Sequence, residues 1–259
     1  MSTTTPNPRR RLLAACTLAC AAAAMTAPAM AFDWSVGRSE QVQGNGNIKR
    51  QAREVGHFNG VAFSLPGQVE IRTGNSESLT IETDDNLLPL IETVVEDGTL
   101  KIRNKNKVNI KTRTLKIVVQ AREVDRLALA GSGSIDADRV TGSRLKFDVG
   151  GSGNIKVRRA EGESISVNLG GSGDLKVEEG GARSLSASIG GSGIVDMAHV
   201  RLEKASVTVA GSGDATLWVR DSLSMTVAGS GDVNYYGDPQ VSKSVVGSGG
   251  ARRLGAAPR

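Results

Sequence analysis

The sequence contains few cysteines, histidines and aromatic residues. Aromatic residues make up 3% of the chain, and there are two histidines and two cysteines. Both cysteines, Cys16 and Cys20, lie before residue 32. If this segment is removed during export, no disulfide can form, so stability has to come from a buried core and backbone pairing. Neither His57 nor His199 has other ligand-type residues at metal-binding spacing, so the sequence predicts no metal site and no cofactor.

A strong charge of either sign is also absent once residues 1–31 are set aside. Without Arg9, Arg10 and Arg11 the chain has 29 basic against 27 acidic residues, a formal charge of +2. With so little excess charge and few aromatic side chains, it is not expected to bind nucleic acid. Its Gly-Ser-Gly triplets precede strand patterns and lack the lysine of a phosphate-binding loop.

Residues 1–31 have the pattern of a cleaved signal peptide. Arg9–Arg11 precede an uncharged apolar run, Leu12–Ala27, and Ala29-Met30-Ala31 then provides the small-x-small pattern that signal peptidase recognises. We predict cleavage after Ala31 and export to the periplasm or the cell surface. The apolar run is shorter than the roughly 20 residues of a membrane span. The mature chain is therefore expected to have no transmembrane segment.

Two other interpretations of this segment rank below the plain signal peptide. Leu13-Ala14-Ala15-Cys16 resembles a lipoprotein cleavage box, which would place a lipid on Cys16, but almost no apolar segment precedes it. The arginines before Leu12-Leu13 faintly resemble a twin-arginine signal. Both interpretations still predict export.

The triplet Gly-Ser-Gly recurs at a nearly constant spacing in the second half of the chain. Successive triplets are 20, 20, 20, 20, 18 and 18 residues apart, and they begin at Gly131, Gly151, Gly171, Gly191, Gly211, Gly229 and Gly247. A fixed period of about 20 residues is typical of one supersecondary unit stacked on the next. The two shorter steps predict turns that lose two residues without a loss of register.

Each repeat contains two short runs in which apolar and polar residues alternate. After Gly171 these runs are Asp174–Val177 and Leu185–Ile189, with a predicted turn at Glu178–Arg183. One face of each run is apolar, and only stacking against other repeats can bury it. We predict an all-β fold, a parallel β-helix (solenoid) with coils of about 20 residues and the triplets at its corners. An antiparallel meander with hairpins at the triplets is the alternative, but it would tolerate more variable spacing.

The remaining segments are less regular. Residues 32–56 form a polar lead-in, in which Gly44–Lys49 resembles a degenerate first turn of the repeat. Short alternating runs between 58 and 129 predict half-buried strands, and Asp84-Asp85-Asn86 before an apolar run predicts a short helical turn. Residues 239–259 are expected to form a terminal coil, which is frayed or acts as a cap because Lys243 falls at an inward position, and a flexible tail from Ala251.

The corners and two further segments resemble the head GIN domain family. The segments are FNGVAFSLPGQVEI from Phe58 and DDNLLPLIETVVEDGTLKI from Asp84, and the resemblance covers residues 57–238. It implies a right-handed β-helix and an exported protein, and the family, of unknown function, is called an auto-transporter adhesin. It offers no catalytic residues. About 20 residues follow Asp238, too few for a barrel of at least eight strands of about ten residues, so a complete autotransporter is not expected.

Acidic residues after the corners give the alternative function, a carbohydrate-active enzyme. In stacked coils Asp214 and Asp232 would lie about 5 Å apart, a separation suited to acid–base work on a glycosidic bond. Asn, Asp and Ser at such positions more commonly bond to their own corner backbone. No Lys, Arg, His or Tyr recurs beside them, so we expect no enzymatic activity.

Small polar residues at equivalent outward positions predict a surface that we call the polar strip. It comprises Ser166, Asn168, Ser186, Ser188, Ser206, Thr208, Ser224 and Thr226. Such a strip could dock a glycan, an envelope protein or another copy of the fold, or it could be a solvated β-face. Trp218, Tyr235 and Tyr236 could stack on sugars or cap the core. We expect an exported, non-enzymatic binding or scaffold module, with self-association through the coil ends as a further alternative.

Overall fold

The computed structural model describes residues 40–105 and 108–258. The predicted signal segment, with cleavage after Ala31 and the alternative lipid position Cys16, lies outside these residues. Within them, the one element that is not a strand is a 3-10 turn, η1 (Leu88–Leu90). The strands are β1 (Glu40–Gln43), β2 (Ile48–Arg53), β3 (Gly60–Phe63), β4 (Gln68–Thr73), β5 (Ser78–Asp84), β6 (Ile91–Glu96), β7 (Thr99–Asn104), β8 (Val108–Lys111), β9 (Leu115–Ala121), β10 (Arg126–Gly131), β11 (Ser134–Gly151), β12 (Asn154–Gly171), β13 (Asp174–Gly191), β14 (Ile194–Gly211), β15 (Asp214–Gly229), β16 (Asp232–Tyr236), β17 (Gln240–Gly247) and β18 (Gly250–Gly255).

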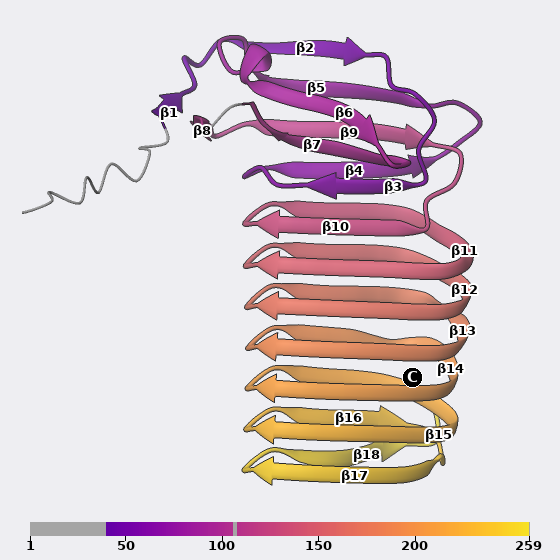
Figure 1. Cartoon of the computed structure of the whole chain (residues 1–259). Coiled ribbons are helices and arrows are strands. Elements are labelled where there is room, and N and C mark those ends of the chain that lie inside the picture. The colour runs from indigo at the N-terminus through magenta and orange to yellow at the C-terminus, as the bar shows by residue number, and fades with distance from the viewer. Residues whose placement is uncertain (1–39, 106–107, 259) are drawn as a thin grey trace, which may run out of the picture. The chain divides into compact units, whose positions relative to one another are not determined.

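The long strands β11 to β15 form the repeated coils (Figure 1). Each pairs in parallel with the next, so that Ile135 lies beside Ile155 and Ile155 beside Leu175, one period further along the chain. Parallel pairing of successive strands needs a chain that winds round to its starting edge, which a hairpin at the triplet cannot do. The predicted parallel β-helix with coils of about 20 residues is therefore confirmed.

Each coil from β11 to β15 is one bent strand rather than the two short strands predicted, whereas the last repeat does have two, β16 and β17. β13 continues without interruption through Glu178–Arg183, where the sequence had suggested a turn. Gly180 lies in this bend with φ at +141°, and a Cβ there would clash with the carbonyl oxygen of Ala160. The prediction was wrong because the bend keeps its backbone pairing to the neighbouring coils, which local sequence does not reveal.

The Gly-Ser-Gly triplets lie at the corners, as expected. Gly171 has φ at +114° and sits directly against Gly151, its equivalent in the previous coil. The backbone N–H of Ser172 donates to the carbonyl oxygen of Gly151 at 2.8 Å. The positive φ and the close approach of two backbones are both permitted by glycine and resisted by residues with a Cβ.

Aliphatic side chains fill the interior of the coils in columns. One column contains Ile155, Leu175, Val195, Ala215 and Val233, none of which is more than 1% exposed. Burial of each larger member stabilises the fold by roughly 1.5–3 kcal/mol relative to exposure. No single coil encloses its own core, so each depends on its neighbours.

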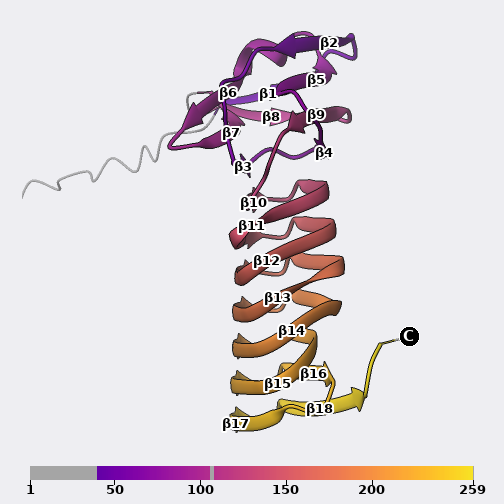
Figure 2. The ribbon, with the colours of Figure 1, turned by 90° about the vertical axis from the view of Figure 1, so that its right-hand side faces the viewer.

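The N-terminal strands combine parallel and antiparallel pairing and close one end of the stack (Figure 2). β3 pairs in parallel with β10 and β7, and β4 pairs in parallel with β11 and β9. β5 pairs antiparallel with β9 and β2, and β6 pairs antiparallel with β7. The half-buried strands predicted between residues 58 and 129 are confirmed.

The predicted helical turn is present as η1, but the acidic residues before it do not cap it. The N-cap is Leu87, without a side-chain hydrogen bond. Asp84 instead accepts the backbone N–H of Gly46 and the hydroxyl of Thr112, each at 2.6 Å. Gly44–Lys49 is not a corner of the coil either, because β2 runs antiparallel to β5 and the loop before it folds back onto Asp84.

The C-terminal end of the stack is formed by β16, β17 and β18. Lys243 lies beside Met225, the predicted inward position, and it is exposed, as is the whole of β17. The tail from Ala251 is not free as far as Gly255, because β18 pairs in parallel with β16. This prediction failed because small and basic residues still form a strand when a neighbouring edge offers backbone partners.

Candidate binding surfaces

The polar strip exists as predicted from the register. Ser166 lies beside Ser186, which lies beside Ser206, and Ser224 follows. In the second column Asn168, Ser188, Thr208 and Thr226 align in the same way. Ser166 is half-buried, and all the others are exposed. Because the strands are about 4.8 Å apart, the strip presents two straight rows of polar groups at a regular spacing.

The side chains of the strip are uncharged, and nearly all of them make no hydrogen bond to the rest of the described chain. Both columns continue to Ser242 and Ser244 on β17. Among the described residues, Asn168 is the one member whose side chain bonds to the protein, through Nδ2 to Oδ1 of Asp148 at 2.8 Å. Lys204 lies beside the strip, between Ser184 and Ser222. This face therefore presents regularly spaced hydroxyl donors and acceptors on the sheet.

The acidic corner residues bond from one coil to the next. Asp214 Oδ1 accepts the backbone N–H of Asp232 at 2.8 Å, and Asp174 Oδ1 accepts that of Ile194 at 3.0 Å. The expectation that such residues bond to their own corner is therefore wrong in detail, because stacking brings the next coil's N–H within reach. For Asp214 this arrangement gives the carboxylate a structural partner.

An apolar hollow lies at the N-terminal end of the face that carries the strip. Its volume is about 330 Å³. Small outward residues form its floor because no long side chain covers the sheet there, and charged side chains border it. It is lined by Ala62, Phe63, Ser64, Lys101, Ile102, Arg103, Ala128, Leu129, Ala130, Asp148 and Gly150. The sequence did not reveal it because its residues come from four separate segments.

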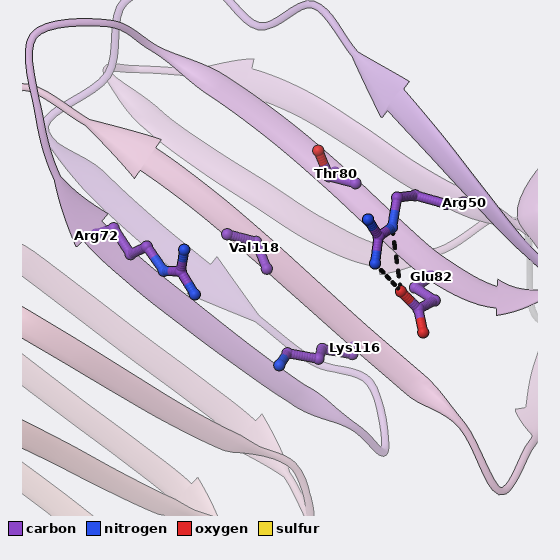
Figure 3. A pocket seen from close by; sticks show the side chains of 6 residues that line it. All are labelled: Arg50, Arg72, Thr80, Glu82, Lys116 and Val118. Atoms are coloured by element: carbon purple, nitrogen blue, oxygen red, sulfur yellow. Dashed lines mark hydrogen bonds and ion pairs between the residues drawn. The ribbon is translucent and has the colours of Figure 1, made fainter.

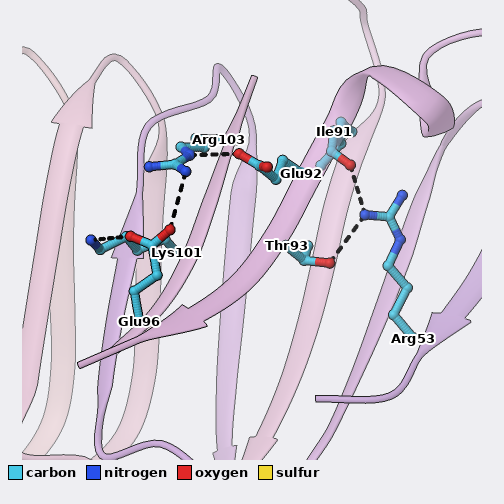
Figure 4. A network of polar contacts seen from close by, with 7 residues as sticks. All are labelled: Arg53, Ile91, Glu92, Thr93, Glu96, Lys101 and Arg103. Atoms are coloured by element: carbon cyan, nitrogen blue, oxygen red, sulfur yellow. Dashed lines mark hydrogen bonds and ion pairs between the residues drawn. The ribbon is translucent and has the colours of Figure 1, made fainter. Parts of the chain in front are cut away.

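Charged side chains on β6 and β7 fix one border of this hollow (Figure 4). Arg103 donates to Glu92 at 2.7 Å and to Glu96 at 3.4 Å, and Lys101 donates to Glu96 at 2.6 Å. The bond to Glu92 raises the pKa of Arg103, and the bond from Lys101 lowers the pKa of Glu96. Beside this network Arg53 donates to the carbonyl oxygens of Leu88 and Ile91, which ties β2 to the segment around η1.

A second hollow, of about 440 Å³, lies on the outer face of the N-terminal sheet (Figure 3). Arg50, Arg72 and Lys116 surround Thr80 and Val118, together with Glu82. Arg50 pairs with Glu82 at 2.6 Å, and Glu70 pairs with Arg72 at 2.7 Å and with Lys116 at 3.6 Å. The hydrogen bond from Arg72 lowers the pKa of Glu70. Each cation has an acidic partner, but Arg72 and Lys116 share Glu70, so this hollow keeps an excess of one positive charge.

The three aromatic residues singled out from the sequence divide between two roles. Tyr235 packs against the core. Trp218 is half-buried on the outside, and the guanidinium carbon of Arg201 lies 5.1 Å from the centroid of its ring. Tyr236 is half-buried beside Gly255. Trp218 is therefore the residue of the three that borders a hollow with charged groups.

In residues 40–105 and 108–258, no three His, Cys, Asp or Glu side chains gather closely enough to hold a metal ion. The same part of the chain contains no helix with the length and hydropathy needed to cross a bilayer.

Comparison with known proteins identifies the kind of domain. The model of a family described as "Putative auto-transporter adhesin, head GIN domain" matches residues 57–239. No curated protein matches the chain.

Solved structures share the fold. A structure titled "Putative lipid binding protein" from Parabacteroides distasonis is 26% identical, with a TM-score of 0.67 over 83% of this chain and 100% of its own. A "putative adhesin" from Bacteroides fragilis is 22% identical, with a TM-score of 0.76 over 82% and 100%. Another, from Parabacteroides merdae, is 20% identical, with a TM-score of 0.63 over 83% and 99%.

Proposed function

The chain belongs to the head GIN domain family, and from this premise we propose that it is an exported, non-enzymatic binding module of the cell envelope or surface. The observation that carries this proposal is the polar strip, two rows of exposed hydroxyl and amide groups in register on successive coils. The partner is a neutral glycan chain lying along the strip.

The chemistry of the strip favours a neutral, hydroxyl-rich ligand. Of the charged side chains in register with the strip, Lys146 and Asp148 pair with each other at 3.0 Å, and Lys204 flanks its middle. The strip itself offers a charged ligand no counter-charge, whereas a sugar chain can exchange hydrogen bonds with each Ser and Thr in turn. The sheet is rigid, so binding costs little ordering of the protein. A flat polar surface keeps bridging water, which serves hydroxyl ligands better than apolar ones.

The test begins with an array of neutral and charged glycans and the mature protein. A ligand found there is then measured against the double variant Ser186→Arg and Ser206→Arg, which places two long side chains in the strip. Thr216→Arg, half-buried on another outward face of the coils, is the matched control. We expect the double variant to lose binding and the control to keep it, with both unfolding at the wild-type temperature. Full binding by the double variant, or binding of an envelope protein alone in a pull-down, would contradict this proposal.

The apolar hollow favours a second function, binding of a lipid. The Parabacteroides distasonis structure is titled a lipid binding protein, and this chain has a hollow whose floor includes Ala62, Ala128 and Gly150. Alkyl chains gain free energy from such a surface at roughly 25 cal/mol per Å² buried. A fluorescent fatty acid should bind wild type and not Ala128→Glu, while Ala198→Glu, on a distant coil, should bind normally. Equal binding of the fatty acid by both variants would show that the hollow is not its binding site.

A further inference from the structure

The coils change their period at one place, the step from β14 to β15. Met197 lies beside Leu217, but the next pair is Arg201 with Trp218. Ala198–Val200 therefore have no paired residue on β15 and form a bulge, in which His199 is exposed while Val200 stays in the core. A compensating shift follows between Leu202 and Lys204, after which the strands return to register. The two residues that the sequence shows to be lost are thus lost at this bend. The resulting register shift places the guanidinium of Arg201 against the indole of Trp218.

A groove runs beside this bulge on β12 to β15. Its volume is about 620 Å³, and its floor is formed by Gly180, Gly181 and Ala182. Gly181 lies between Glu161 of the previous coil and Arg201 of the next. Because Gly181 has no side chain, the space between these two long residues stays open.

Arginine side chains dominate the walls of the groove. Arg183, His199 and Arg201 are exposed along it, and Arg220 lies at its end. Arg220 pairs with Asp221 at 2.7 Å and with Glu203 at 3.8 Å. In the described part of the chain neither Arg183 nor Arg201 has a carboxylate within the 4.0 Å of an ion pair.

Acidic side chains in and near the groove are already engaged. Glu161 pairs with Arg159 at 2.6 Å. On another outward face of the same coils, Lys156 meets Glu178 at 2.8 Å and Lys176 meets Asp196 at 3.5 Å. The groove therefore has two guanidinium groups for which the fold supplies no anion.

We propose that this groove binds an acidic polysaccharide, a sugar chain that carries carboxylates. Guanidinium groups form paired hydrogen bonds with carboxylates, and Arg201 is oriented for this by its contact with Trp218. The indole edge supplies an apolar surface for the C–H groups of a sugar ring. The Gly180–Ala182 floor leaves space for a ring in the middle of the groove. This site uses different residues from the polar strip, and its test is independent of that surface.

The experiment uses polygalacturonate fragments and the same fragments with their carboxylates reduced to alcohols. In a Trp34→Phe background Trp218 is the one tryptophan of the mature chain, so its fluorescence reports on the groove. We expect the acidic fragments to change this fluorescence in a saturable way that weakens as salt rises. The reduced fragments should bind at least tenfold more weakly.

Variants decide whether the two arginines are responsible. Arg183→Gln with Arg201→Gln should weaken binding about tenfold or more, since each loses a charge-assisted hydrogen bond. Arg158→Gln, whose side chain lies 3.5 Å from Asp138 outside the groove, is the matched control and should bind within twofold of wild type. Equal binding of acidic and reduced fragments, or unchanged binding by the double variant, would overturn the proposal. Tighter binding of poly-glutamate than of the sugar would overturn the assignment to a polysaccharide.

Discussion

Asp214 and Asp232 occupy equivalent corners of successive coils, and the carboxylate of the first accepts the backbone N–H of the second at 2.8 Å. A carboxylate bound in this way holds two coils together, as an N-cap residue holds the first turn of a helix.

We therefore predict that Asp214 contributes to stability and not to catalysis. Asp214→Ala should lower the free energy of unfolding by about 1 kcal/mol, because the N–H of Asp232 loses its acceptor at a partly exposed site. Asp214→Asn keeps an acceptor oxygen and should lose less than half of that. Urea unfolding measures both. Polysaccharide hydrolysis that wild type performs and both Asp214→Asn and Asp232→Asn lose would instead support the carbohydrate-active alternative.

The corner glycines give a prediction with a close internal control. Gly171→Ala should destabilise the fold by about 2–4 kcal/mol, because its φ is +114° and the new methyl group would overlap the carbonyl oxygen of Gly151. Gly170→Ala, one residue earlier, meets no atom within 4 Å and should change stability by about 0.5 kcal/mol or less. Thermal and urea unfolding of the pair would show whether the corner is as constrained as the structure indicates. Similar values for both would contradict it.

Lys243 should restrain self-association at the C-terminal coil. Val241 and Val245 flank it and are 40% and 38% exposed, and β17 pairs with β15 alone among the described strands. A charge at an inward position of an edge strand discourages another strand from adding to it. The Lys243→Val variant should therefore associate, so that its sedimentation coefficient rises with protein concentration. Lys204→Val, which removes the same charge from the middle of the stack, should stay monomeric like wild type. Concentration-dependent association of wild type itself would support the self-associating alternative.

Acid should weaken the loop around Asp84. The hydrogen bond from Thr112 is the main cause that lowers the pKa of this buried carboxyl in the folded protein. The unfolded chain then binds more protons than the folded one as the pH falls, so the stabilisation is complete above the unfolded pKa of about 3.9 and decreases below it.

The variant Thr112→Val removes the main donor and keeps the shape of the side chain. It should be less stable at neutral pH, and its stability should fall less between about pH 5 and pH 2 than that of wild type. Chemical unfolding at several pH values provides the measurement. Parallel pH curves for the two proteins would show that this bond does not set the acid response.

Much of the solenoid could be predicted because its rules are local. Alternation of apolar and polar residues decides which side of a strand is buried, and a constant period decides which residues become neighbours. Those two facts suffice for the polar strip, from Ser166 to Thr226, and for the position of Lys243. They did not reveal that Glu178–Arg183 stays within one strand, because the pairing of that bend comes from adjacent coils.

The hollows depend on relationships that no single segment contains. The hollow on the outer face of the N-terminal sheet needs Arg50, Arg72 and Lys116 to meet across antiparallel and parallel pairings that are separated by long stretches of chain. The groove needs a register shift at Ala198–Val200, and the sequence shows only that two residues are lost somewhere in the repeat.

The sequence by itself thus determined the repeat, its corners and the outward face that carries the hydroxyl groups, because each follows from backbone geometry at a fixed period. Tertiary structure decided which carboxylate meets which N–H at the corners, how the N-terminal strands close the stack, and where the arginines lack acidic partners. Those outcomes depend on long-range register, in which a shift of one residue exchanges the two faces of a strand. Only the folded chain reveals these outcomes.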